Sequence, residues 1–356
     1  MKRLSFLLVV LALVAAACGG TEETTETTVP DDSTVTTVAP DPGTDPGTDP
    51  GQDTGKSTLD VVKERGKLIC GVSGSAVAFS ETQPDGSATG FDADYCKAVA
   101  AAVLGDASAV EFRSTTAAER FDVLKSGEID VLFRNTTWTQ SRDSDVGLDF
   151  GPVTYFDGQQ LMGPGDRFTV DSSAADVDGA VLCTNTGTTT EKNIVEWARL
   201  GGATIVVEGV ETFPEAMERF KEGTCDLVTT DGSGLVGNKA TETAAGTPGA
   251  AEWVIFPSAP ISKEPLGPAY RQNDSAWGDV INWTIFATVI ADEKGVTSAN
   301  IDENREIDPE AGRLFGLEGE VQSAMGLPAD AFYQVVKQVG NYDEIYSRNL
   351  NPVGLT

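Results

Sequence analysis

The sequence predicts an α/β protein with two lobes, each built on a mostly parallel sheet that is flanked by helices. Two observations predict this class. Between residues 68 and 133, short apolar runs alternate with helix-length amphipathic segments in β-α-β-α-β order, which implies neighbouring parallel strands. The same order repeats between residues 180 and 230, and a mainly helical tail follows. Two such lobes place a ligand cleft between them, at the carboxyl ends of the strands.

The first repeat is expected to contain, in chain order, a strand at 68–72, a helix at 92–104, a strand at 110–112, a helix that begins at Thr116 and a strand at 129–133. Thr116 and Glu119 have the spacing of a capping box, in which each side chain accepts a hydrogen bond from the backbone N–H of the other residue. Gly127 suits the left-handed conformation that ends many helices.

The second repeat is expected to contain a strand at 180–183, a helix at 188–200, a strand at 204–207, a helix capped by Thr212 and a strand at 226–230. Thr188 with Glu191, and Thr212 with Glu215, repeat the capping-box spacing. The tail is expected to form helices at 277–293 and 329–339, with a short turn from Pro309 between them.

Residues 1–17 have the features of a lipoprotein signal peptide. Lys2 and Arg3 give a basic start, and an apolar run too short to span a bilayer leads to three alanines before Cys18. Small residues directly before a cysteine resemble the bacterial lipobox. Cys18 is therefore expected to be lipidated and to anchor the protein to the cell membrane on its extracytoplasmic side. Such boxes usually carry leucine where this chain has Ala15, and the alternative is an ordinary cleaved signal with an unmodified Cys18.

Residues 18–56 are expected to be a disordered tether. The segment is rich in threonine, proline and acidic residues, and it has no aromatic residue. It cannot bury enough apolar surface to offset the loss of chain entropy on folding. Because its acidic residues repel one another and its prolines stiffen it, we expect an extended connection between the anchor and the folded lobes.

The composition excludes several classes of function. The formal net charge is −30, which argues against nucleic acid as a partner because phosphate binding requires clustered lysine and arginine. The chain has no histidine, so it cannot carry a Ser-His-Asp or Cys-His nucleophile or a histidine-ligated zinc. We expect no metal site and no cofactor.

Several short segments occur in an order that identifies a known family. The segments are RGKLICGV (65–72), GFDADYCKAVA (90–100), SGEIDV (126–131), TWTQSR (137–142), NTGTTTE (185–191), TTDGS (229–233) and ISKEPLGP (261–268). They resemble the extracytoplasmic amino-acid-binding proteins of polar amino acid ABC importers, the family 3 solute-binding proteins, and the later segments are most similar to the general L-amino-acid-binding branch. The resemblance covers about residues 58–349.

The resemblance implies a periplasmic-binding-protein-like fold of type II, in which two hinge strands join the two lobes. The first lobe is then discontinuous and contains residues 57–155 and 260–356, while residues 156–259 form the second lobe. The hinge crossings are expected near residues 153–158 and 254–261. Residue patterns alone suggest the two lobes but do not place the return crossing.

The resemblance also implies the function. Such a protein binds free L-amino acids in the cleft, closes by hinge motion and delivers its ligand to ABC permease subunits that work with a cytoplasmic ATPase. We expect a monomer that is not an enzyme.

The resemblance places the carboxylate of the amino acid between the lobes. Arg142 matches the family position that binds this carboxylate with a planar guanidinium fork, and Thr137 supplies a hydroxyl on the same side. The backbone N–H groups of Thr188 and Thr189 are the implied donors from the second lobe, since a helix N-terminus favours an anion. The alternatives are that Arg142 is a surface arginine paired with a neighbouring aspartate and that Thr188 only caps a helix.

The ammonium of the amino acid requires an acceptor. Asp231 follows the last strand of the second repeat and matches the amine-binding acid of the family; the alternative is an ordinary turn aspartate. Thr137 and the backbone carbonyl of Asn135 are implied as the other acceptors, although many relatives have glycine in place of Asn135. Phe79, in the loop after the first strand, is the candidate for stacking on the ligand side chain.

Four cysteines divide evenly between the lobes. Exported proteins meet oxidising conditions, so disulfides are expected, and four cysteines allow three sets of pairings. Because a bridge between the lobes would block hinge motion, we favour pairs within each lobe, Cys70 with Cys96 and Cys183 with Cys225. Buried free thiols are the alternative.

Two other functions remain open at this point. The same fold hosts a dehydratase that acts on prephenate-like acids, and fold alone does not fix function. The absence of histidine and the pairing of Arg142 with Asp231 argue for a binding protein. A surface adhesin or signalling lipoprotein that has lost its ligand is the second rival.

Overall fold

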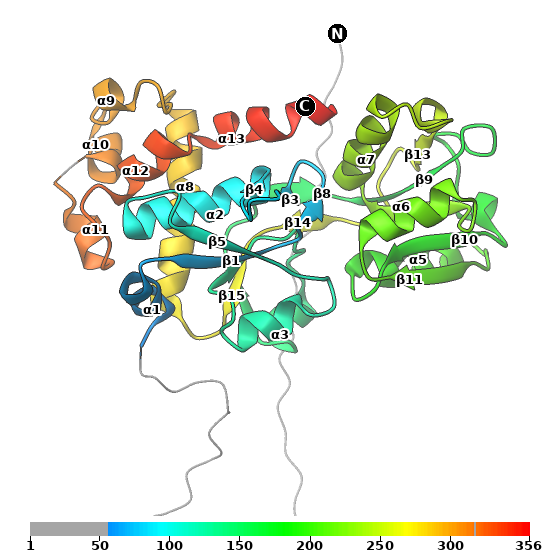
Figure 1. Cartoon of the computed structure of the whole chain (residues 1–356), viewed down its shortest axis with the longest axis horizontal. Helices are drawn as coiled ribbons and strands as arrows, with labels where there is room; N and C mark the ends of the chain where they lie inside the picture. The colour runs from blue at the N-terminus through cyan, green and yellow to red at the C-terminus, as the bar shows by residue number, and fades with distance from the viewer. Residues whose placement is uncertain (1–55, 317) are drawn as a thin grey trace, which may run out of the picture. The chain divides into compact units, whose positions relative to one another are not determined.

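The structure of the protein, a computed structural model, describes residues 56–316 and 318–356. The expected signal peptide, Cys18 and nearly all of the tether lie outside these residues. Figure 1 shows two α/β lobes in the described part of the chain, and the second lobe is drawn in green. None of the helices in the described ranges has the length and apolar character that a membrane span requires.

The sheet of the first lobe joins strands from both ends of the folded region. Its order is β5 (Val110–Ser114), β1 (Leu68–Val72), β6 (Val131–Leu132), β15 (Ala269–Arg271) and β7 (Leu148–Phe150). The first three strands pair in parallel, as predicted, whereas β15 pairs antiparallel with both of its neighbours. A small antiparallel sheet of β2 (Ser75–Ala76), β3 (Ser80–Thr82) and β4 (Ala88–Thr89) follows β1.

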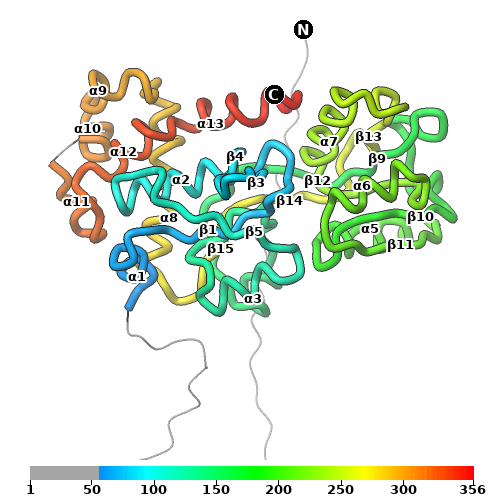
Figure 2. Tube along the Cα trace, viewed as in Figure 1, coloured from blue at the N-terminus to red at the C-terminus, as the bar shows by residue number. Residues whose placement is uncertain are grey.

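The core of the first lobe surrounds α2 (Phe91–Leu104), whose residues are nearly all buried. It packs against α8 (Ser275–Glu293), α12 (Ala331–Gln338) and α13 (Tyr342–Asn349), which lie beside it in Figure 2. Because α2 is enclosed by its neighbours, its sequence is apolar on nearly every side. The other helices of this lobe are α1 (Thr58–Arg65), α3 (Arg120–Lys125), α4 (Gln140–Ser144), α9 (Ile301–Asn304), α10 (Pro309–Phe315) and α11 (Glu320–Ala324).

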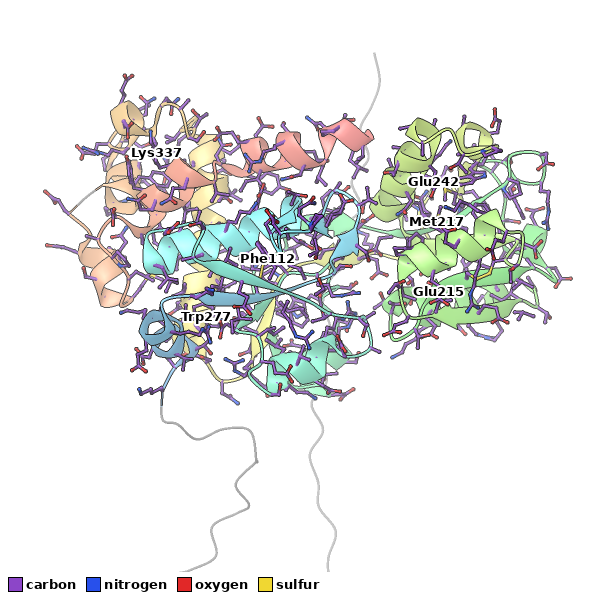
Figure 3. The ribbon with its side chains drawn as sticks, in the orientation of Figure 1. Phe112, Glu215, Met217, Glu242, Trp277 and Lys337 are labelled. Atoms are coloured by element: carbon purple, nitrogen blue, oxygen red, sulfur yellow. A yellow bond between two sulfur atoms is a disulfide. The ribbon has the colours of Figure 1, made fainter. Side chains whose placement is uncertain are left out.

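The second lobe repeats the plan of the first. Its sheet has the order β11 (Val206–Val210), β10 (Val181–Asn185), β12 (Leu227–Asp231), β9 (Gln159–Gly163) and β13 (Val254–Phe256), and its helices are α5 (Thr189–Leu200), α6 (Phe213–Lys221) and α7 (Gly232–Ala244). Strand β9 is antiparallel to both neighbours, as β15 is in the first lobe. Met217 lies in the core of this lobe, and Trp277 lies in the core of the other (Figure 3).

Two short strands connect the lobes. Strand β8 (Tyr155–Asp157) pairs antiparallel with β14 (Glu264–Leu266), which places Asp157 opposite Glu264. The return crossing lies after β13, because this strand still belongs to the second sheet. The reversed strands β9 and β15 each follow one of these connecting strands. They enter their sheets from the opposite lobe, which explains why each runs against its neighbours in an otherwise parallel sheet.

Some helix boundaries differ from the sequence prediction. Thr116 and Glu119 make the reciprocal hydrogen bonds of the predicted capping box, both at 3.2 Å, but the regular helix α3 begins only at Arg120. Thr212 precedes α6 without making any side-chain capping bond. The sequence prediction missed α7, because the glycines in its first two turns lower its helix propensity.

The structure contains both disulfides that we favoured. Cys70 in β1 is bonded to Cys96 in α2, with Cα atoms 6.0 Å apart. Cys183 in β10 is bonded to Cys225, which lies just before β12, with Cα atoms 5.9 Å apart. Each bridge stays within one lobe, so neither restrains the connection between the lobes.

Candidate functional site

A cavity of about 250 Å³ lies between the lobes, where the carboxyl ends of the strands meet. Its walls include residues that directly follow β1 and β6 in the first lobe and residues at the ends of β10 and β12 in the second. The structure brings every residue predicted to bind the ligand to this one cavity. These residues are Phe79, Asn135, Thr137, Arg142, Thr188, Thr189 and Asp231.

Arg142 is buried in the wall formed by the first lobe. It lies in α4, and its Nη1 donates a hydrogen bond of 2.7 Å to the carbonyl oxygen of Thr137. Its guanidinium carbon lies 5.2 Å from the centre of the Phe121 ring. Burial lowers the pKa of Arg142, and the charges of Glu264 and Asp231 partly oppose this shift. The burial of Arg142 contradicts the alternative of a surface arginine.

The start of α5 forms the wall of the second lobe. The Thr188 hydroxyl caps the helix by accepting a hydrogen bond of 3.0 Å from the Glu191 N–H. Backbone N–H groups in the first turn of a helix have no intrahelical acceptor, so this end is suited to an anion. Gly187 has a φ of +80°, and a Cβ there would lie 3.2 Å from the Cα of Ala118 in the first lobe. Glycine therefore permits both the turn and the close approach of the lobes.

Asp231 ends β12 and occupies the N-cap position of α7. Burial raises the pKa of its carboxyl well above the ordinary value, and the charges of Asp157 and Glu264 raise it further. The charges of Arg120 and Arg142 act in the opposite direction. No ion pair joins Asp231 to a basic residue in the part of the chain that the structure describes. The carboxyl is therefore available to a cationic group that enters the cavity.

Asn135 is held in an unusual backbone conformation. Its φ is +41°, which glycine adopts easily and asparagine tolerates. The backbone N–H donates a hydrogen bond of 2.8 Å to the buried carboxylate of Asp92. The side-chain Oδ1 is buried and has no hydrogen-bond partner among the described residues. A buried acceptor without a donor is costly, so an incoming N–H group would stabilise it.

Phe79 forms part of the cavity wall, but its ring is nearly fully buried in the first lobe. It packs edge-on against Phe91 and Tyr155, with ring centres 5.9 Å and 5.5 Å away. Only its rim is therefore available to a ligand.

Sequence reasoning missed two further arginines in the cavity wall, Arg120 and Arg134. Arg120 is 2% exposed, and its Nε has no hydrogen-bond partner among the described residues. Burial lowers its pKa well below the ordinary value, and the nearby guanidinium groups of Arg142 and Arg134 add to the shift. A signal was present in the sequence, because an arginine in the first turn of a helix opposes the helix dipole.

Arg134 differs from Arg120 because it has protein partners. Its Nε donates a hydrogen bond of 2.9 Å to the carbonyl oxygen of Thr115. Burial lowers the pKa of Arg134 to about 10, against the opposing charge of Asp92. Arg120 is therefore the guanidinium with the greater need for an acceptor from a ligand.

Glu264 is an acidic residue that sequence reasoning also missed. It lies in β14 and accepts a hydrogen bond of 2.6 Å from the Thr137 hydroxyl. In this structure the Thr137 hydroxyl is thus bound within the protein, which differs from its expected contact with a ligand. No local pattern around Glu264 indicates this role, because its partners Thr137, Thr189 and Asn193 come from distant segments.

Comparison with known proteins identifies the family. Residues 68–294 match the bacterial extracellular solute-binding proteins, family 3. The chain belongs to this family. This solute-binding protein is 44% identical over 296 residues to the glutamate/glutamine/aspartate/asparagine-binding protein BztA of Rhodobacter capsulatus, covering 83% of this chain and 85% of the relative. It is 42% identical over 297 residues to the general L-amino acid-binding periplasmic protein AapJ of Rhizobium johnstonii, with the same coverage of 83% and 85%.

Solved structures agree with the two-lobed type II fold of this solute-binding protein. A periplasmic binding protein of an ABC transporter from Brucella ovis, with glutathione bound, matches with a TM-score of 0.76 and 40% identity. The match covers 83% of this chain and 91% of that structure. An ancestral arginine-binding protein bound to glutamine matches with a TM-score of 0.54 and 27% identity, covering 65% of this chain and 94% of that structure.

Proposed function

We propose that this solute-binding protein captures free L-amino acids in the cavity and delivers them to ABC permease subunits that work with a cytoplasmic ATPase. One observation carries the proposal: Arg142 of the first lobe and Asp231 of the second line the same cavity. A free amino acid carries a carboxylate and an ammonium on one carbon, so it requires partners of both signs. The names of the relatives from R. capsulatus and R. johnstonii support this ligand class.

Arg142 and the start of α5 hold the carboxylate in this proposal. The guanidinium of Arg142 uses Nη1 to bond the carbonyl of Thr137, which fixes its plane and leaves its other N–H groups for two parallel bonds to a carboxylate. The N–H groups of Thr188 and Thr189 approach the same anion from the second lobe. A single carboxylate is then contacted from both sides of the cavity.

Asp231 accepts the ammonium. Burial, together with the charges of Asp157 and Glu264, raises the pKa of its carboxyl, and the ligand ammonium supplies a cation that favours the ionised form. The Oδ1 of Asn135, which has no partner within residues 56–316 and 318–356, is a second acceptor for the ammonium, in addition to the backbone carbonyl. This arrangement offsets the desolvation of both the protein carboxylate and the ligand charge.

Arg120 recognises the ligand side chain. Its buried Nε needs an acceptor, and a side-chain carboxylate or amide oxygen provides one. The relative from R. capsulatus is named for binding glutamate, glutamine, aspartate and asparagine, all of which carry such an oxygen. The rim of Phe79 contacts the aliphatic part of the same side chain.

Hinge motion at β8 and β14 closes the two lobes around the ligand. We place residues 57–155 and 262–356 in the first lobe and residues 156–261 in the second, two residues later than the resemblance implies, since the strands β9 to β13 lie between these limits and Ile261 still bonds Gln159 in β9. The protein acts as a monomer, and lipid on Cys18 anchors it to the cell membrane through the tether at 18–56.

Calorimetric titration of the purified protein with L-glutamate, L-glutamine and L-alanine tests this function. We expect saturable binding with one ligand per protein and the weakest affinity for L-alanine. Mass spectrometry of small molecules released from freshly purified protein is an independent test. The lack of any binding by free amino acids, together with consumption of a prephenate-like acid, would favour the enzyme instead.

A further inference from the structure

The carboxylate of Glu264 is fully engaged within the protein. Glu264 is 1% exposed and, among the described residues, accepts four hydrogen bonds, two on each oxygen. Its Oε2 accepts from the hydroxyls of Thr137 at 2.6 Å and Thr189 at 2.9 Å. Its Oε1 accepts from the Ser262 hydroxyl at 2.6 Å and the Asn193 amide at 3.0 Å. An ionised carboxylate offers about four acceptor positions, so all are used.

Glu264 is fixed to the first lobe by the backbone. Thr137 forms a β-bridge with Leu266, two residues beyond Glu264. The N–H of Trp138 donates a hydrogen bond of 2.9 Å to the carbonyl oxygen of Pro265. Thr137 and Glu264 are therefore expected to move as one unit when the lobes separate.

The contacts of Glu264 with the second lobe differ from those with the first lobe, because they are made only by side chains. Thr189 and Asn193 lie four residues apart on α5, so both side chains project from one face of the helix. Just before Glu264, the N–H of Ile261 bonds the carbonyl of Gln159 in β9, which ties that residue to the second lobe. The pivot therefore lies between Ile261 and Glu264.

We propose that Glu264 is an interlobe clasp that holds the closed form. Separation of the lobes breaks its bonds to Thr189 and Asn193, whereas its bond to Thr137 persists. Ligand release requires opening, so the clasp slows release and has less influence on the first encounter. This inference rests on the proposed hinge function and adds a positioning residue that does not itself line the ligand cavity.

Asn193 offers a clean test, because it contacts Glu264 and does not line the cavity. Asn193→Asp places a second carboxylate against Glu264, so the clasp becomes repulsive. The double variant Glu264→Gln/Asn193→Asp restores a donor and an acceptor, because the glutamine amide donates to the new carboxylate while its oxygen faces the threonine hydroxyls. Lys192→Ala is the matched control, since this residue is exposed on the same turn of α5.

Stopped-flow kinetics of the full-length protein with L-glutamate give the first readout. We expect Asn193→Asp to release L-glutamate roughly tenfold faster, with an association rate constant that is unchanged or higher. The double variant should return to within about threefold of the wild type, and Lys192→Ala should match the wild type. A structural defect alone would not be rescued by exchanging donor and acceptor. Unaltered release by Asn193→Asp, or a double variant worse than the single one, overturns the clasp.

Hydrogen–deuterium exchange of the ligand-free protein gives the second readout. Asn193→Asp should accelerate exchange at the start of α5, and the double variant should reverse the change. This measurement needs no ligand. If the wild type binds no amino acid, the proposed function fails while the clasp is still tested. Equal exchange in all variants contradicts the clasp without affecting the ligand assignment.

Discussion

Asp157 and Glu264 lie directly opposite each other in the antiparallel pair of strands that connects the two lobes. Each carboxylate reaches a different helix of the second lobe. Asp157 accepts hydrogen bonds from the backbone N–H and the hydroxyl of Ser233 at the start of α7, while Glu264 bonds Thr189 at the start of α5. Burial raises the pKa of Asp157, and the charge of Glu264 contributes to the shift. The connection between the lobes therefore concentrates negative charge beside the cavity, which favours a ligand with an ammonium group.

The first prediction separates the two ends of the ligand. Arg142→Met and Asp231→Asn should each weaken L-glutamine binding by at least about tenfold, or ~1.4 kcal/mol, because each strands a charge of the ligand in the cavity. Replacing L-glutamine by its decarboxylated amine should lower the affinity of Arg142→Met little further, because this variant no longer binds the carboxylate. Replacing L-glutamine by its deaminated acid should lower the affinity of Asp231→Asn little further, because this variant no longer pairs with the ammonium.

Calorimetry with the two variants and the three ligands completes both double-mutant cycles. Binding by Arg142→Met within about twofold of the wild type would show that this arginine does not hold the carboxylate. Additive losses of binding free energy in both cycles would show that neither residue contacts the α-carboxylate or the α-ammonium of the ligand.

The second prediction concerns selectivity for the side chain. Arg120→Met should weaken L-glutamate binding by roughly 1.5–3 kcal/mol, the range for a hydrogen bond to a charged group, and should change L-alanine binding much less. Arg113→Met, at an exposed arginine in the same lobe, is the control and should leave both affinities unchanged. Competition titrations measure the ratio of the two affinities. An equal loss of affinity for both ligands would show that Arg120 contacts the α-carboxylate or α-ammonium of the ligand instead of its side chain.

The third prediction concerns pH. In the ligand-free protein, burial raises the pKa of Asp231, so its carboxyl holds a proton at pH values where an exposed aspartate is ionised. Pairing with the ligand ammonium requires the ionised form, so binding releases this proton and the affinity rises with pH until the raised pKa is passed. L-glutamine suits the measurement because its side chain does not titrate. In the wild type, affinities should keep rising with pH above the range in which an exposed aspartate titrates, whereas Asp231→Asn should give a weaker and flatter profile.

The fourth prediction concerns the disulfides. Non-reducing peptide mapping should recover Cys70 with Cys96 and Cys183 with Cys225. Replacing the second pair by alanine should lower the free energy of unfolding by about 3–4 kcal/mol, as expected for a loop of this length, and should leave ligand affinity nearly unchanged. Denaturant unfolding and calorimetry check the two statements. Four alkylatable thiols in freshly isolated protein would contradict the pairing.

The fifth prediction concerns the anchor. Cys18→Ser should move the protein from the membrane fraction to the soluble extracytoplasmic fraction or leave its signal peptide uncleaved, because the lipid attachment site is lost. Fractionation followed by mass spectrometry of the N-terminus distinguishes these outcomes. A processed variant that stays in the membrane fraction would rule out lipid anchoring through Cys18.

Local pattern accounts for the elements that the sequence predicted well. The helix α5 begins where the Thr188 cap indicates, and the strand β1 has the predicted bounds. The parallel pairing of β1 with β5 and β6 follows from the β-α-β order. These features depend on neighbours within a few turns of chain, which is the range over which periodicity and capping act. The residues expected to bind the ligand were predicted instead from the family resemblance. A resemblance carries information about the fold, whereas composition does not.

Tertiary structure decided the features that depend on distant segments. Glu264 bonds Thr137 and Thr189, which lie 127 and 75 residues away in the chain, so no local pattern marks it. The sequence marks Arg120 only as an arginine in the first turn of a helix, and it is tertiary packing that buries its Nε without a partner among the described residues. By itself, the sequence determined which segments form helices and strands and which charges are available. The closure of two lobes around one cavity decided which of those charges meet, because burial and hydrogen bonding depend on distance in space and not along the chain.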